Sequence, residues 1–460
     1  MSQTNFASLA INDLLIQNLA TLHYQSMTPI QSQSLPAILE GNDVIGQAKT
    51  GSGKTAAFGL GLLNKLTISD LHVQGLILCP TRELADQVSK DLRKLARTLS
   101  NVKILTLAGG LPFKAQASSL AYGAHIVVGT PGRILDHLER EHLDLTQVTT
   151  CVLDEADRML DMGFQEALDS IAKHVPKERQ TLLFSATFPE HIQHISQHLM
   201  QQPVHIQVND QHNQDCIEQH FYEINPLDDR IQMLSKILSA YPVESTIVFC
   251  NTKRDTKDVS NALIYQGFSA LALNGDLEQW ERDQAMIRFA NQSISILIAT
   301  DVAARGLDIK DLDLVVNYHI AQSPETHVHR MGRTGRAGKQ GIACSIFSQK
   351  ESFKVTRLGD YLERNIIGES LDVSPKEQKT TRQDRMTTLQ IGGGKKQKIR
   401  AGDILGALTS EGGIEGKQVG KIHILDQWAY VAVERSVVNQ AFKKLNDGLL
   451  KGKKFRVRRI

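Results

Sequence analysis

The chain has few cysteines, no long apolar run and no visible targeting segment, and each shortage excludes a class of protein. Its 460 residues include five cysteines, which are scattered without the spacing of metal ligands or a disulfide framework. This pattern favours a reducing compartment, and we expect a cytoplasmic location. No stretch of about 18 consecutive apolar residues occurs, which argues against a membrane-spanning helix. The N-terminus also lacks the basic and apolar segments of a secretory signal.

Excess charge is small overall but unevenly distributed. The whole chain has a net charge of +2, whereas residues 386–460 hold 15 Lys and Arg against 6 Asp and Glu, or +9. The other 385 residues hold 37 basic and 44 acidic groups, or −7. A basic end on a mildly acidic body suggests an enzyme core with a nucleic-acid-binding appendage. A basic tail that only aids solubility remains the alternative.

Short apolar runs alternate with longer amphipathic stretches, which is the β-α-β rhythm of a doubly wound parallel sheet. The rhythm restarts after the polar residues 209–215 and therefore predicts two tandem α/β domains, residues 1–208 and 217–371. The expected strands of both domains lie at residues 75–79, 125–128, 150–153, 181–184, 246–250, 296–299 and 314–316.

A second polar stretch, residues 372–385, is typical of a flexible linker. The remaining residues, 386–460, show a different order of elements, β-α-β-β-α-β, which is the ferredoxin-like pattern of an RNA-recognition motif. We expect strands at 387–391, 420–424, 428–433 and 454–460, and helices at 401–408 and 436–445.

A glycine-rich segment, Ala48 to Thr55, follows a short strand and opens a helix. Glycines allow backbone N–H groups to surround a phosphate, and the helix N-terminus adds its dipole. Lys54 is expected to reach the β and γ phosphates, and the Thr55 hydroxyl to hold Mg²⁺. The nucleotide contacts expected in this loop are Thr50, Gly51, Ser52, Gly53, Lys54 and Thr55. An ordinary glycine-rich turn with an exposed lysine is the alternative.

An acidic run, Asp154 to Asp157, ends the apolar strand 150–153. Carboxylates at this end of a parallel strand face the ligand crevice. We expect Asp154 to hold Mg²⁺ and Glu155 to orient or deprotonate the attacking water. The alternative is a solvated acidic turn.

The second α/β domain carries two arginines three residues apart, Arg333 and Arg336. A guanidinium beside the γ-phosphate stabilises the charge that spreads over its oxygens during transfer. If both arginines do this, ATP binds between the two domains and hydrolysis requires that cleft to close. A basic surface helix is the alternative.

Further motifs complete a set that resembles the DEAD-box RNA helicases over residues 6–350, and the resemblance implies two RecA-like domains. These motifs are Phe6 with 28–31, 80–84, 109–110, 130–133, 185–187, 248–251, Gln279 with Arg282, and 299–308. One departure is His23-Tyr24, where many members have Gly followed by an aromatic residue.

The resemblance also implies roles for individual residues. Phe6 is implied to stack on the adenine base and Gln31 to read its edge, while Asp308 is implied to approach the nucleotide. Ser185, Thr187 and His329 are implied to couple the ATP state to RNA. The implied RNA contacts of the core are Pro80, Thr81, Arg82, Gly110, Thr130, Gly132, Arg133, Gln279, Arg282 and Thr300.

Residues 391–408 are similar to the start of the C-terminal domain of the DbpA subfamily. That similarity implies binding to a hairpin of 23S ribosomal RNA, with the core acting on neighbouring duplexes in a pre-50S particle. Trp428 and Tyr430 alternate on one strand, at the base-stacking positions of an RNA-recognition motif. Packing of these two rings inside the protein is the alternative. We expect further affinity from Lys395, Lys396, Lys398, Arg400, Lys421 and Arg456.

The sequence therefore predicts an ATP- and Mg²⁺-dependent RNA helicase, with a monomer as the default state. An ATP-gated RNA clamp without productive unwinding is a second hypothesis, which intact Glu155, Arg333 and Arg336 disfavour. A DNA helicase is a third, which the RNA-recognition-like end disfavours.

Overall fold

The computed structural model describes residues 5–48, 51–188, 190–208, 216–225, 229–304, 312–335, 340–371 and 384–460. Over these ranges, no helix combines the length and the apolar character that crossing a membrane requires. The chain forms two compact units that divide between residues 212 and 213. Most of the predicted linker, residues 372–383, lies outside the described residues.

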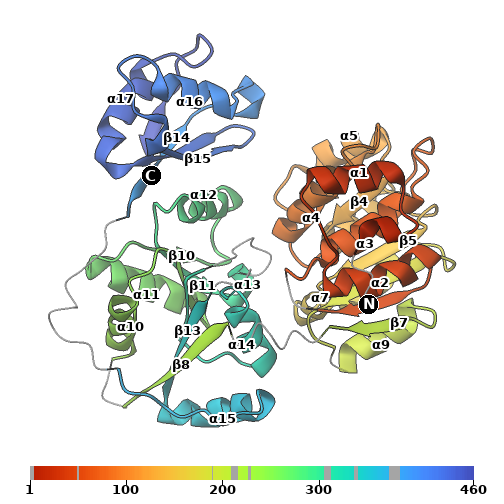
Figure 1. Cartoon of the computed structure of the whole chain (residues 1–460), viewed down its shortest axis with the longest axis horizontal. Coiled ribbons are helices and arrows are strands. Elements are labelled where there is room, and N and C mark those ends of the chain that lie inside the picture. The colour runs from red at the N-terminus through yellow and green to blue at the C-terminus, as the bar shows by residue number, and fades with distance from the viewer. Residues whose placement is uncertain are drawn as a thin grey trace. The chain divides into compact units, whose positions relative to one another are not determined.

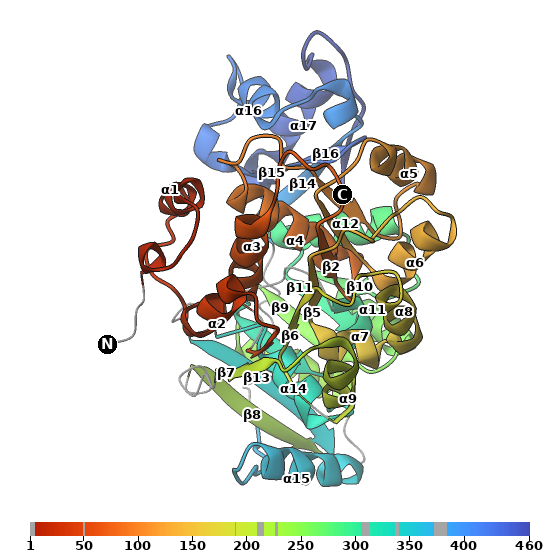
Figure 2. The same cartoon turned by 90° about the vertical axis from the view of Figure 1, so that its right-hand side faces the viewer.

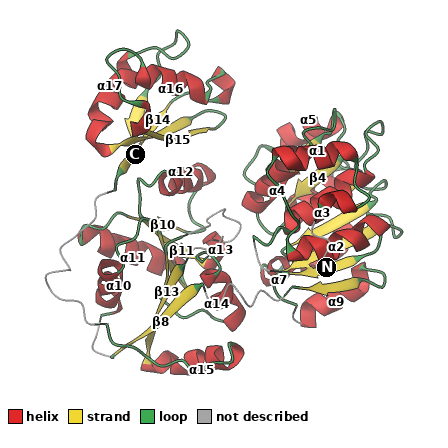
Figure 3. Ribbon diagram, in the orientation of Figure 1, coloured by secondary structure: helices red, strands yellow, loops and turns green. Residues whose placement is uncertain are grey.

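The first unit is built on a seven-stranded parallel sheet in the order β3-β4-β2-β5-β6-β1-β7. Figures 1 and 3 show this sheet among its helices. Its strands are β1 Val44–Gln47, β2 Gly75–Leu78, β3 Ile104–Leu107, β4 Ile126–Gly129, β5 Thr150–Asp154, β6 Gln180–Ser185 and β7 Val204–Gln207. Its helices are α1 Asp13–Thr21, α2 Pro29–Glu40, α3 Lys54–Lys65, α4 Arg82–Leu95, α5 Phe113–Ala121, α6 Pro131–Glu139, α7 Ala156–Asp161, α8 Gln165–Ala172 and α9 Glu190–Leu199.

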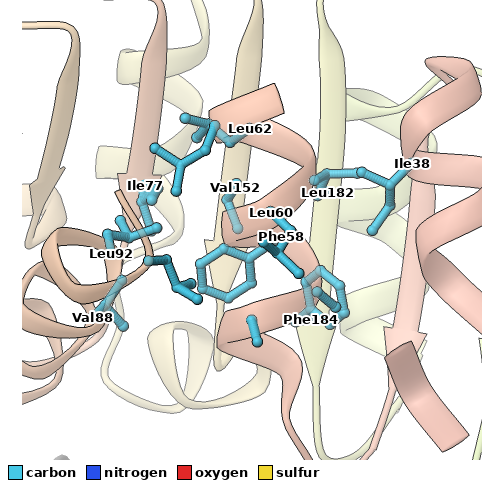
Figure 4. Packing of buried hydrophobic residues seen from close by; sticks show 14 of the residues in the cluster. Ile38, Phe58, Leu60, Leu62, Ile77, Val88, Leu92, Val152, Leu182 and Phe184 are labelled. Atoms are coloured by element: carbon cyan, nitrogen blue, oxygen red, sulfur yellow. The ribbon is translucent and has the colours of Figure 1, made fainter. Parts of the chain in front are cut away.

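Both faces of the central strands of this sheet are buried, which is why β2, β4, β5 and β6 are nearly continuous apolar runs. Val152 and Leu182 pack with Phe58 of α3 and Leu92 of α4 on one face (Figure 4). The next residue along a strand points to the opposite face. Leu153 accordingly joins a second core, built with α5 to α9.

The second unit contains a six-stranded parallel sheet in the order β10-β11-β9-β12-β13-β8. Its strands are β8 Ile217–Ile224, β9 Thr246–Cys250, β10 Ala270–Leu273, β11 Ile296–Thr300, β12 Leu314–Asn317 and β13 Gly341–Ser348. Its helices are α10 Arg230–Ala240, α11 Lys253–Tyr265, α12 Gln279–Ala290, α13 Asp301–Ala304, α14 Pro324–Met331 and α15 Ser352–Tyr361. We call the part of the second unit that these elements form, from Ile217 to Tyr361, the second motor domain.

The C-terminal domain, residues 386–460, has a four-stranded antiparallel sheet in the order β15-β16-β14-β17. Two helices cover one face of that sheet (Figure 2). Its elements are β14 Met386–Ile391, α16 Ala401–Thr409, β15 Val419–Ile424, β16 Ala429–Glu434, α17 Val438–Asp447 and β17 Val457–Arg459. The predicted fold class, two parallel sheets followed by a small α+β domain, is confirmed.

Candidate functional site

The glycine-rich loop of the first unit closes around a buried lysine. Gly51 and Gly53 have left-handed backbones, with φ of 88° and 97°. A Cβ on Gly53 would lie 2.4 Å from Gln31 Nε2, so this position requires glycine. Lys54 is the first residue of α3, and its Nζ donates to the Ala48 carbonyl at 2.7 Å. Thr50 lies outside the described residues.

This loop is a suitable anion site, because a helix N-terminus and a buried ammonium group are placed together. Lys54 is only 6% exposed. Ser52 and Thr55 flank it and are half-buried. The residues present therefore fit the phosphates of a nucleotide.

Asp154 ends β5 and is 3% exposed. Burial raises the pKa of this carboxyl to about 7; Lys54 opposes the rise and Glu155 adds to it. A divalent cation would offset the cost of burying the charged form. The acidic end of β5 therefore fits Mg²⁺, with Asp154 and Thr55 as the residues that would hold it.

Glu155 has an unusual backbone for a residue with a side chain. Its φ of 55° and ψ of 52° are left-handed, and the residue stands at the start of α7. Such conformations are costly and concentrate at functional sites. Its carboxylate is buried and forms an ion pair of 3.1 Å with Arg158.

The acidic run is hydrogen-bonded to the segment that follows β6. Asp157 accepts bonds from the Thr187 backbone N–H at 3.0 Å and the Thr187 hydroxyl at 2.9 Å. The Asp157 backbone N–H donates to Ser185 Oγ at 3.3 Å. The structure thus joins the predicted coupling residues Ser185 and Thr187 to the predicted Mg²⁺ site. Sequence reasoning did not select Asp157, although it closes the same acidic run.

The two residues predicted to contact the base are buried. Phe6 is 3% exposed and packs edge-on against Tyr24. Gln31 accepts from the Thr28 backbone N–H at 2.9 Å and donates to the Gly53 carbonyl at 3.0 Å. Gln31 therefore supports the phosphate loop, and the contact of both residues with a base stays a prediction.

Two of the predicted RNA motifs in the first unit lie at helix N-termini. Thr81 caps α4 by accepting from the Leu84 backbone N–H at 3.3 Å, and it follows buried Pro80. Arg82 pairs with Glu83 at 3.0 Å. Thr130 is the residue before α6, and a Cβ added to Gly132, in that helix's first turn, would meet nothing within 4 Å.

A third predicted contact, Arg133, is held by Gln116, which sequence reasoning missed. Gln116 is 6% exposed and donates to the Ala108 carbonyl at 2.8 Å. Its side-chain oxygen accepts from Arg133 at 2.9 Å and lies 3.1 Å from His137 Nε2. Arg133 also donates to the Leu111 carbonyl at 3.2 Å, beside Gly110 with its φ of 79°. The only sequence signal was a polar residue on the buried side of α5.

His137 completes this network as a neutral ring. Burial lowers its pKa to about 4, and the positive charge of Arg133 lowers it further. The ring stacks on Phe113, with centroids 4.1 Å apart. The loop around Gly110 and the start of α6 are therefore fixed to each other by buried groups.

In the second motor domain, Arg330 connects several segments, and sequence reasoning did not select it. Its side chain is buried and makes two bonds of 2.7 Å with the Asp301 carboxylate. It also donates to Asn317 at 3.0 Å and to Asn251 at 3.1 Å. A paired, bidentate arginine of this kind fixes the relative positions of α13, β12, α14 and the residue that follows β9.

Two of the predicted residues of this domain, His329 and Arg333, lie close to Arg330 in the chain. Arg333 is 6% exposed, and its N–H donates to the Arg330 carbonyl at 3.2 Å. His329 is half-buried on α14. Arg336 and Asp308 lie outside the described residues.

The predicted RNA contacts on α12 connect to the end of β11. Arg282 donates to the Ala303 carbonyl at 3.3 Å, and the Ala303 N–H donates to Thr300 Oγ1 at 3.3 Å. Gln279 donates to Asp283 at 2.7 Å. Gln279, Arg282 and Thr300 therefore belong to one connected region.

In the C-terminal domain, the predicted basic contacts are exposed, whereas Tyr430 is not. Tyr430 is 2% exposed, and Gln390 donates to its hydroxyl at 3.3 Å. The ring of Tyr430 has no accessible face in this structure, so its stacking on a base stays a prediction, and packing inside the protein is the alternative that its burial favours. Trp428 is 38% exposed. The exposed basic residues are Lys395, Lys396, Lys398, Arg400, Lys421 and Arg456.

Comparison with known protein families gives three matches along the chain. Residues 28–195 match the DEAD/DEAH box helicase model, and residues 229–338 match the helicase conserved C-terminal domain. Residues 388–459 match the DbpA RNA binding domain.

Individual proteins give the same result. The chain is 51% identical to the ATP-dependent RNA helicase DbpA of Escherichia coli, over 96% of both chains. It is 45% identical to the DEAD-box ATP-dependent RNA helicase CshA of Bacillus cereus, over 76% of this chain and 66% of that one. A solved structure of S. cerevisiae Dbp5 bound to RNA and ADP BeF3 has a TM-score of 0.71 at 28% identity, covering 82% of this chain and 98% of that one.

Proposed function

This chain belongs to the DEAD-box ATP-dependent RNA helicases, within the DbpA subfamily, and we propose that it remodels short duplexes of 23S ribosomal RNA during assembly of the large ribosomal subunit. Its reaction is RNA-dependent hydrolysis of ATP to ADP and phosphate. The proposed setting is a monomer that acts in the cytoplasm on a pre-50S particle.

The nucleotide chemistry can be assigned to the residues at the phosphate loop. Lys54 would bind the β and γ phosphates, with Thr55 and Asp154 holding Mg²⁺, which supplies positive charge to the phosphates. Glu155 would orient the attacking water and accept its proton. Arg333 would stabilise negative charge on the transferred phosphoryl group. Asp157 would pass the state of this site to Thr187 through their paired hydrogen bonds.

The observation that supports selectivity for one RNA is the exposed basic loop after β14. Core contacts to a sugar-phosphate backbone carry no sequence information. Lys395, Lys396 and Lys398 are all exposed within four residues, and Arg400 follows them. Beside this loop, Trp428 offers a partly open ring. We therefore place the hairpin at this end of the C-terminal domain.

Helicase activity is favoured over a static RNA clamp by the buried catalytic groups. A clamp that never completes turnover has no use for Glu155 held in a costly backbone conformation. A clamp also does not need Arg333, whose proposed role is to speed up ATP hydrolysis and not to bind ATP.

The proposal is tested by unwinding and ATPase assays on matched substrates. One short duplex carries the ribosomal hairpin as an extension, and the other carries an unrelated hairpin of equal length. We expect ATP-dependent separation of the first at much lower protein concentration, and ATPase stimulation by RNA but not by DNA. Equal unwinding of both duplexes would refute the ribosomal target. Binding without turnover would support the clamp.

A further inference from the structure

The C-terminal sheet has a second face that no helix of its own domain covers. Side chains alternate along a strand, so Leu389, Val431 and Val433 enter the domain core while their neighbours point the other way. An antiparallel sheet with helices on one side usually leaves its other side in solvent. The exposed fractions on this second face are nevertheless small: 0% for Thr388, 7% for Gln390, 2% for Tyr430 and 1% for Ala432.

The second motor domain covers this face, and both parts lie within one compact unit. Asn291, which follows α12, donates to Thr388 Oγ1 at 3.1 Å and lies 3.1 Å from His423 Nε2. Ser293 shares a hydrogen bond of 2.6 Å with Thr388. A further hydrogen bond joins Ser269 to Asp384, ahead of β14.

Buried polar groups on both sides satisfy one another across this contact. Asn291 and Ser293 are 3% and 7% exposed. Burial raises the pKa of the Tyr430 hydroxyl, and the nearby charge of Asp283 on α12 raises it further. Polar atoms that are buried in pairs mark a specific interface, because each would be costly to leave without its partner.

We propose that this face, formed by Thr388, Gln390, His423, Tyr430 and Ala432, is a docking surface for the segment 283–293 of the second motor domain. The C-terminal domain then moves with that motor domain as one body. Tyr430 serves the interface and does not stack on RNA bases.

The position of the docked segment gives the interface a role in the reaction. Helix α12 begins with Gln279 and Arg282, and Arg282 bonds to the segment after Thr300. An RNA held by the C-terminal domain is thereby kept at a fixed position relative to these predicted RNA contacts. This consequence rests on the proposed function, whereas the docking itself does not.

The basic loop stays available to RNA in the docked state. The Lys395 and Lys396 N–H groups donate to the Leu425 and Asp426 carbonyls, at 2.8 and 3.0 Å. These bonds place the loop at the turn between β15 and β16, beyond the covered residues. Docking and RNA binding therefore use different parts of the domain.

The discriminating variant is Ala432→Arg, in the full-length protein without RNA. An open sheet face would accept an arginine, whereas a docked face has no room for one. We expect hydrogen exchange of residues 284–293, in the other domain, to accelerate at least tenfold. The reciprocal variant Asn291→Ala should accelerate exchange of residues 386–391. Thr409→Arg, at an exposed position on α16, is the matched control and should change neither segment.

The Kd of the isolated hairpin, compared with unwinding of the attached duplex, distinguishes the docking proposal from the proposed ribosomal target. We expect Ala432→Arg to keep the hairpin Kd within twofold while unwinding of the attached duplex falls severalfold. Unchanged exchange in both variants would overturn the docking. A tenfold change in hairpin Kd without faster exchange would instead make this face the RNA platform. Absence of any hairpin preference in the wild-type protein would refute only the ribosomal target.

Discussion

At the scale of single residues, Asp154 carries a conflict between stability and activity. Its ordinary pKa is 3.8, and burial raises the pKa to about 7 in the folded protein. The folded state therefore loses stability as pH rises from about 4 to about 7, because the unfolded chain releases the proton first. Above pH 7 the loss in the free energy of unfolding reaches up to about 4 kcal/mol, at 1.36 kcal/mol for each pKa unit.

We predict that Asp154→Asn stabilises the protein without ligands at pH 8 and abolishes Mg²⁺-dependent hydrolysis. The gain in the free energy of unfolding should shrink towards zero near pH 4, because the wild-type carboxyl is then protonated in both states. Denaturant unfolding at several pH values measures it. Asp86→Asn, at a carboxyl whose side chain is 54% exposed, is the control. A loss of stability at pH 8 would show that this carboxyl is not penalised by burial.

Arg333 is predicted to act in the transition state of hydrolysis. Arg333→Lys keeps the charge but loses the planar fork, so kcat should fall by roughly 10³ or more while the KM for ATP changes little. Single-turnover hydrolysis with saturating RNA measures the effect. An equal loss in ATP affinity would make Arg333 a ground-state binding residue.

At the scale of secondary-structure elements, most of the buried strands could be predicted, whereas the short edge strands could not. The expected strands also omitted β8 and the buried strand β13. The predicted run 246–250 coincides with β9, because every side chain in it is buried. By contrast, β3, β7 and β10 lie at or beside sheet edges, and β7 exposes three of its four residues. Four half-exposed residues carry no period that distinguishes a strand from a loop.

Site residues could be predicted where a local sequence motif marks them, and could not where their role depends on contacts with distant parts of the chain. Lys54 and Asp154 could be identified because each follows a strand in a recognisable local pattern. Gln116 and Arg330 could not, since their roles depend on bonds to residues distant in the chain. The burial of Tyr430 depends likewise on its covering by α12, more than 130 residues earlier.

The Gln116 network predicts how α5, α6 and the loop around Gly110 act together. Gln116→Ala should raise the RNA concentration for half-maximal ATPase about tenfold, since losing buried hydrogen bonds costs about 1–3 kcal/mol. The KM for ATP should not change, because the phosphate loop is separate from this network. RNA titrations of the ATPase measure it, with Ser118→Ala, at an exposed position of the same helix, as control. An unchanged RNA requirement would mean that Arg133 needs no support.

At the scale of the whole molecule, catalysis and target choice are assigned to different parts of one chain. The first unit and the second motor domain carry the ATPase motifs, and neither contains the excess positive charge. Residues 386–460 carry a net charge of +9. Because phosphate contacts release counterions, RNA binding by this end should weaken steeply as salt rises.

The most direct test of this division is the ATPase response to the ribosomal hairpin and to an unrelated RNA of equal length. The full-length variant Lys395→Glu with Lys396→Glu is compared with the wild type. A control of equal charge change, Lys417→Glu with Lys443→Glu, places the same charges at exposed sites outside the basic loop. We predict that the wild type and the control prefer the hairpin strongly, and that the loop variant loses this preference but keeps its basal ATPase. Undiminished preference in the loop variant would contradict the account.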